Sequence, residues 1–169
     1  MELINNYNKF ITDLKSKINT NNEIIFFCIG TDRVIGDCIG PITGSILKRK
    51  INSNYVYGDL EENLTFDNIT EKIDEVESKF NNPYIIAIDA ALSTEQNIGK
   101  IFIDYSGISI GQGLNKNKKS IGNIGIKVVV GKNRNDIDLN FKTLQNISLN
   151  QVIYFSKKIS DGILYALNK

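Results

Sequence analysis

The stretch IIFFCIGTDRVIGDCIGP, residues 24–41, decides the fold of this chain. Its first six residues form an unbroken apolar run, which is typical of a strand buried on both faces of a parallel sheet. A polar loop with three glycines, residues 30–40, comes next. Pro41 suits the first turn of a helix because its missing N–H costs nothing there, and we expect this helix to run to about Lys50. The stretch therefore predicts a strand, a loop and a helix in succession.

Comparable patterns recur along the rest of the chain, as helical spacing of apolar residues or as short apolar runs. They predict helices at about 3–18, 66–80 and 149–167, strands near 55–57, at 84–88 (closed by Asp89), 101–103 and 124–130, and a loop at 106–123 that is too polar for the core. Alternating strands and helices favour parallel pairing with right-handed crossovers. The prediction is an α/β fold, a three-layer α-β-α sandwich with a mostly parallel sheet. Without an internal repeat or linker, residues 1–169 are expected to form a single domain.

Composition excludes several classes of function. The net charge of the 169 residues is +1, so neither nucleic acid nor an acidic membrane surface is an expected partner. No apolar run approaches the roughly 18 residues that span a bilayer, and the N-terminal residues lack the apolar stretch of a signal peptide, so we expect a cytoplasmic protein. The absence of histidine excludes Ser-His and Cys-His nucleophile pairs and His-containing zinc sites, and two cysteines are too few for an all-cysteine zinc site. We expect no metal and no cofactor.

The candidate site lies where two predicted strands end. In open parallel sheets, ligands bind outside the carboxyl ends of strands where the strand order reverses. With the common order 2-1-3, that crevice lies between the first and third strands, and it receives Asp37 from one loop and Asp89 from the other. Two carboxylates in one low-dielectric crevice do not both ionise easily, so one keeps a proton and the pair offers an acid and a base. Thr31, Asp32 and Arg33 of the first loop are expected to support the site or bind substrate.

Structural roles for the same residues are the alternative. An Asp before a helix commonly caps it, and an Asp that ends a strand often makes a turn with its own backbone. For Asp32 and Arg33 an ion pair between the two is the simplest structural role. The sequence alone leaves these alternatives open.

Four segments of the chain resemble one known family. They are CIGTDRVIGDCIGPITG (28–44), VYGDL (56–60), IIAIDAAL (85–92) and GQGLNK (111–116). Together they resemble the YyaC-like sporulation protein family, which is related to the germination protease of spore-forming bacteria and more distantly to hydrogenase-maturation endopeptidases. The similarity covers nearly the whole chain after the first helix.

The resemblance implies a phosphorylase/hydrolase-like sandwich and an aspartate-dependent site. The germination protease degrades small acid-soluble spore proteins, and its two key aspartates match Asp37 in GDCIGP and Asp89 in AIDA. Asp32 and Arg33 belong to the TDR signature of the YyaC-like group, to which the resemblance gives a supporting role. The hydrogenase endopeptidases hold nickel with a His and two acidic residues, and since this chain has no His, no nickel site is expected.

The sequence thus predicts a sporulation-associated endopeptidase in which an aspartate pair activates water for peptide-bond hydrolysis. Its expected partner is a protein or peptide substrate, with small acid-soluble spore proteins as candidates, in the cytoplasm of a spore-forming cell or its forespore. Self-association into a homo-oligomer is compatible with the sequence. The alternative is a non-enzymatic sporulation factor that uses the same crevice to bind peptide. A third reading is a metal- or phosphate-dependent hydrolase on the same sandwich.

Overall fold

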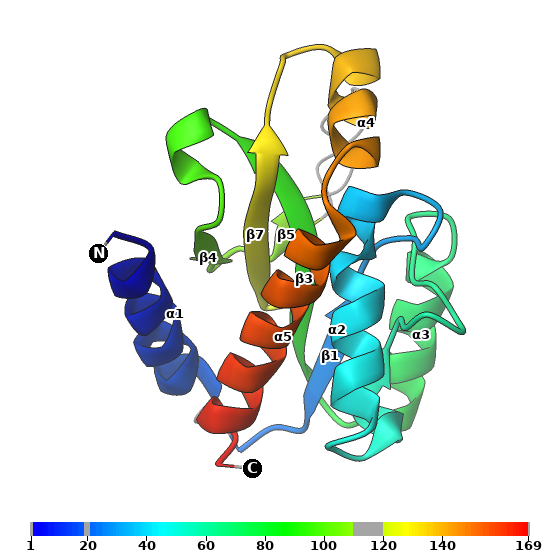
Figure 1. Cartoon of the computed structure of the whole chain (residues 1–169). Coiled ribbons are helices and arrows are strands. Elements are labelled where there is room, and N and C mark those ends of the chain that lie inside the picture. Colours follow the sequence, from blue (N-terminus) through cyan, green and yellow to red (C-terminus); the bar gives the residue numbers. More distant parts are fainter. Residues whose placement is uncertain (1, 19–20, 110–119, 169) are drawn as a thin grey trace.

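A five-stranded sheet forms the centre of the computed structural model, which describes residues 2–18, 21–109 and 120–168 (Figure 1). The strand order is β2-β1-β3-β7-β4, so the predicted order of the first three strands, 2-1-3, is confirmed. The strands are β2 (Val56–Tyr57), β1 (Ile24–Cys28), β3 (Tyr84–Ser93), β7 (Ile124–Lys132) and β4 (Ile101–Asp104).

The three central strands, β1, β3 and β7, are parallel, and β1 and the first half of β3 are apolar on both faces. β1 pairs with β3 from Ile24 opposite Tyr84 to Cys28 opposite Ile88. Apart from the first residue of each strand, these paired segments are buried on both sides. Removing both faces of a strand from water favours an uninterrupted apolar run over an alternating one, which is why the sequence marks these strands so clearly.

Helices cover the two faces of the sheet unequally. On one face lie α1 (Glu2–Ile18), α2 (Ile39–Lys48) and α5 (Leu149–Ala166), whose apolar sides share one core cluster with the sheet. On the other face lie α3 (Ile69–Lys79) and a small sheet made of β5 (Ile108–Ser109) and β6 (Ser120–Ile121). Figure 1 shows α5 and α2 in front of the sheet and α3 beside β1. The predicted three-layer sandwich is confirmed.

Two strands differ from their predicted form. β3 does not end at Asp89 but continues to Ser93, because β7 pairs with it along this extension. β4 lies antiparallel to β7 at the edge of the sheet. The connection from β3 to β4, residues 94–100 with the short 3₁₀ turn η3 (Glu95–Asn97), is too short to carry the chain back for a parallel strand.

The polar region between β4 and β7 was predicted wrongly in part. Ile108 and Ile121 are buried at 2% and 1% exposure and pack under α3, because β5 and β6 pair and turn both side chains toward the sheet. Residues 110–119 of the predicted loop, including the GQGLNK segment, lie outside the described residues.

One helix was not predicted. α4 (Ile137–Gln145) begins at Asp136, whose carboxylate accepts a hydrogen bond of 2.8 Å from the Leu139 N–H. Ile137, Phe141 and Leu144 have helical spacing, so the sequence does carry a short apolar pattern here that was overlooked, although none of the helix residues is fully buried. The remaining elements are the 3₁₀ turns η1 (Ile35–Cys38) and η2 (Ser53–Tyr55). Within the described residues no helix is long and apolar enough to cross a membrane.

Candidate functional site

The loop after β1 folds back on itself at Gly30. Gly30 has φ +142°, and a Cβ at this position would lie 2.1 Å from the carbonyl oxygen of Asp37. Only glycine allows so close an approach in this backbone conformation. The turn brings the Thr31 N–H to 3.1 Å from Oδ2 of Asp37. The carboxylate of Asp37 therefore has a fixed position just beyond the end of β1.

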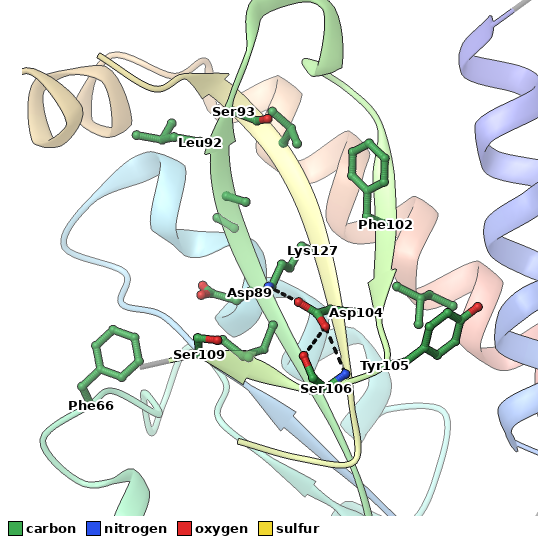
Figure 2. Close-up of a pocket in the computed structure, with 15 residues that line it drawn as sticks. Phe66, Asp89, Leu92, Ser93, Phe102, Asp104, Tyr105, Ser106, Ser109 and Lys127 are labelled. Carbon is green, nitrogen blue, oxygen red and sulfur yellow. Dashed lines mark hydrogen bonds and ion pairs between the residues drawn. The ribbon is translucent and has the colours of Figure 1, made fainter. Parts of the chain in front are cut away.

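Asp89 occupies the corresponding place on the neighbouring strand. It follows Ile88, the last residue of β3 that pairs with β1, and in the register with β7 it lies opposite Lys127. Asp89 is partly exposed and lines an open groove on the sheet, into which its carboxylate points (Figure 2). Both aspartates thus sit at the point where the strand order reverses, as the sequence predicted.

Burial and neighbouring charge raise the pKa of the two carboxyl groups to different extents. Desolvation raises the pKa of Asp89 well above its usual range, and the negative charge of Asp37 raises it further, whereas the Ala90 N–H and Lys127 oppose this rise. Desolvation also raises the pKa of Asp37, and the hydrogen bond from Thr31 opposes it. The structure therefore brings together the two side chains that the sequence singled out. Of the two, Asp89 has the pKa that is raised further, so it more strongly favours its protonated form.

The other predicted residues surround this pair less closely. Thr31 orients Asp37 through its backbone N–H, and its hydroxyl oxygen accepts a bond of 3.3 Å from the Arg33 N–H. Asp32 is exposed, and its backbone N–H donates to the side chain of Asn63 at 3.0 Å. Arg33 is exposed and makes no ion pair within the described part of the chain. The suggested Asp32–Arg33 ion pair is therefore not formed, because the loop turns both side chains toward solvent.

The two cysteines are held as thiols. Burial raises the pKa of Cys28 inside β1. Burial also raises the pKa of Cys38, and the negative charges of Asp32 and Asp37 add to the effect. A thiolate nucleophile is therefore disfavoured at both positions.

Sequence reasoning missed a second polar group beside Asp89. Lys127 of β7 places its Nζ 2.7 Å from Oδ2 of Asp104, the last residue of β4. Oδ1 of Asp104 accepts bonds from the Ser106 N–H at 3.0 Å and from its hydroxyl at 2.6 Å (Figure 2). The available signal was a single lysine that interrupts the apolar run IGIKVVV at residues 124–130.

The donor groups of this region do not form a metal-binding cluster. Among the described residues, no three His, Cys, Asp or Glu side chains lie close enough together to hold an ion. The chemistry that the arrangement offers is acid–base catalysis by two carboxyl groups with unlike affinities for a proton.

Three comparisons relate this chain to known proteins. Residues 1–162 match the family model described as "Protein of unknown function (DUF1256)". The chain is 30% identical over 141 residues to "Uncharacterized protein YyaC" of Bacillus subtilis (strain 168), an alignment that covers 83% of this chain and 67% of that protein. Its fold is similar to the crystal structure of the [NiFe] hydrogenase maturation protease HycI from Thermococcus kodakarensis KOD1, with a TM-score of 0.61 and 15% identity. That likeness covers 92% of this chain and 99% of the other, and at this identity it concerns the fold alone.

Proposed function

The chain belongs to the YyaC-like family of DUF1256 proteins, and from this premise we propose that it is an endopeptidase that hydrolyses peptide bonds with the pair Asp37 and Asp89. The observation that carries the proposal is the placement of Asp37 and Asp89 after the neighbouring parallel strands β1 and β3, where the strand order reverses. The charge of Asp37 also raises the pKa of Asp89, in agreement with this placement. Carboxyl groups arranged in this way share one proton and act as acid and base together. The likeness to a maturation protease in fold agrees with this function.

The roles of the two aspartates follow from their surroundings. Asp37 accepts a hydrogen bond from the Thr31 N–H, which favours its ionised form. In the proposed reaction it removes a proton from a water molecule, and the water oxygen attacks the carbonyl carbon of the peptide. Asp89 holds the shared proton and gives it to the carbonyl oxygen. When the tetrahedral intermediate breaks, the C–N bond cleaves and the leaving nitrogen takes the proton that Asp37 received. One hydroxyl of the intermediate returns its proton to Asp89, so both carboxyl groups recover their starting states.

The proposed substrates are small acid-soluble spore proteins, and the proposed location is the cytoplasm of a spore-forming cell or its forespore. Both come from the family resemblance. No resident cofactor or metal has a part in the proposed mechanism.

Two variants test the reaction. Asp37→Asn and Asp89→Asn keep the size of each side chain and remove its ability to exchange a proton, so each should lower cleavage of purified small acid-soluble spore proteins by about 100-fold or more. Fragments are measured by mass spectrometry over a range of pH values. Asp74→Asn, at an exposed position on α3, is the matched control and should cleave like the natural protein.

The results separate the two functions considered for this crevice. Cleavage that survives in both variants would reject the aspartate mechanism. If the natural protein binds the spore proteins and leaves them intact at every pH, the crevice is a peptide-binding site and the protein is a non-enzymatic factor.

A further inference from the structure

An open groove runs over the sheet beside Asp89. It has a volume of about 1030 Å³ and lies on the face of β3, β7 and β4 that α3 and the β5–β6 pair leave uncovered (Figure 2). Asp89, Lys127 and Asp104 lie side by side across its floor, and the lining continues along the strands to Leu92, Ser93 and Val129. The groove therefore includes Asp89 and extends away from it along the sheet.

Lys127 is held in one position on this floor. Its ammonium group is fixed by Asp104, which is fixed in turn by two hydrogen bonds from Ser106. A lysine ammonium carries three N–H donors. Within the described residues Asp104 is the acceptor bonded to it, so donors remain for a ligand in the groove. Asp89 lies directly opposite in the strand register.

The rim of the groove is aromatic and exposed. Phe66 and Phe102 line it and are 52% and 40% exposed. They come from two separate segments, the loop before α3 and strand β4. Large apolar side chains that remain exposed around a concave site with a few polar groups are typical of ligand-binding surfaces.

We propose that this groove binds an extended peptide segment of the substrate, and that Lys127 donates a hydrogen bond to a backbone carbonyl oxygen of that segment next to the bond to be cut. The inference rests on the proposed function and adds the binding site and its polar anchor. An extended peptide presents a carbonyl group about every 3.3 Å and alternates its side chains, which suits a polar floor between apolar walls.

The charges on the floor argue against an anionic ligand. The positive charge of Lys127 is balanced by Asp104 at 2.7 Å, and Asp89 adds a further carboxyl group. A phosphate or nucleotide would meet no net positive charge here. A neutral carbonyl oxygen needs only a donor, and a positioned ammonium group supplies a strong one.

Binding is measured apart from cleavage. The protein used is the Asp37→Asn variant of the whole chain, because Asp37 lies outside the groove lining. It is added to fluorescein-labelled casein, which is an unfolded protein. Fluorescence anisotropy then gives the dissociation constant. Adding Lys127→Met should weaken binding about tenfold or more, because a hydrogen bond from a charged donor is lost. Lys132→Met is the matched control: Lys132 ends the same strand, is 44% exposed and pairs with Glu95 outside the groove, so binding should not change.

A second variant tests the groove even if Lys127→Met fails to fold. Phe66→Ala alters an exposed side chain on the rim and should weaken binding several-fold without unfolding the protein. Three results would each overturn the inference. They are casein binding by the Lys127→Met and Phe66→Ala proteins that is as tight as binding by the Asp37→Asn protein, no casein binding by the Asp37→Asn protein, and displacement of casein by inorganic phosphate.

Failure of this inference and failure of the proposed function give different results. If both groove variants bind normally while the Asp37 and Asp89 variants lose cleavage, the peptidase stands and the groove does not. If the groove variants lose binding while the natural protein leaves spore proteins uncut, the groove is a peptide-binding site without a reaction.

Discussion

Replacing Asp104 by Asn isolates the interaction that holds Lys127 in the groove. In the natural protein the hydrogen bond from Lys127 is the largest cause that lowers the pKa of Asp104 from its ordinary 3.8 to about 2, and the bond from the Ser106 hydroxyl is the next. Asparagine keeps the size of the side chain but carries no charge and has one acceptor oxygen, which can serve either Lys127 or Ser106. The variant therefore removes the ion pair with little change in side-chain volume.

The expected cost to stability follows from that pKa. A lowering of the pKa from 3.8 to about 2 corresponds to about 2 kcal/mol, at about 1.4 kcal/mol for each pKa unit. The side chains of Lys127 and Asp104 are 28% and 34% exposed, so water screens much of their attraction. We expect Asp104→Asn to lower the free energy of unfolding by about 1 kcal/mol at pH 7, which for a chain of this length is roughly 2–4 °C in Tm.

The pH dependence has a definite sign. The pKa of Asp104 is lower in the folded than in the unfolded protein, so its stabilisation is complete above about pH 4 and is lost as the pH falls through 2. Urea unfolding, followed by circular dichroism, should show a difference between the natural protein and Asp104→Asn at pH 7 that roughly halves by pH 3. Glu95→Gln breaks an exposed pair with Lys132 and should change little at either pH. A difference that is absent at pH 7, or that grows toward acid, would refute the reasoning.

Four further predictions concern the aspartate pair and the loop that carries it. Desolvation and the charge of Asp37 raise the pKa of Asp89 in the folded protein. Ionisation of Asp89 therefore lowers the stability of the natural protein as the pH rises above about 3.9. Asp89→Asn has no carboxyl group to ionise at this position, so it lacks this loss. Thermal unfolding should show Asp89→Asn gaining stability over the natural protein between pH 4 and pH 8; a gain confined to acid would contradict this sign. Cleavage should have a bell-shaped pH profile, since one carboxyl group must be protonated and the other ionised, and a single sigmoid limb would argue against a shared proton. Activity should survive dialysis against EDTA, and its loss and recovery with a divalent ion would favour the metal-dependent hydrolase. Gly40→Ala would place a Cβ 1.9 Å from the carbonyl oxygen of Ile29, so we expect a loss of about 3 kcal/mol or more in urea unfolding, and an unchanged midpoint would show that the two backbones can separate.

The aspartate pair shows which features of the candidate site can be predicted from the sequence. Asp37 and Asp89 are 52 positions apart in the sequence. Their location at the same edge of the sheet was nevertheless predictable, because each follows a buried apolar run and parallel strands bring their carboxyl ends to one edge. The degree of desolvation at Asp89 was not predictable. It depends on how segments distant in the sequence pack around the carboxyl end of this part of β3, which no local pattern specifies.

The groove shows where sequence reasoning stops. Lys127 and Asp104 are 23 residues apart and meet only because β4 lies antiparallel to β7. The three apolar residues of β4 do not specify which strand it pairs with, so they do not place Asp104 beside Lys127. Ile108 and Ile121 were missed for a related reason, since two short paired strands bury single apolar residues within polar surroundings.

The sequence by itself determined the central strands, most of the helices, the strand order around β1 and the two aspartates at its reversal point. Short-range sequence patterns predict each of these, because burial of a strand or a helix face requires apolar residues at a regular spacing. The tertiary structure alone decided the extension of β3, the direction of β4, the placing of α4 and the fixed lysine beside Asp89. These depend on contacts between segments distant in the chain, and such contacts leave no periodic trace in the residues that make them.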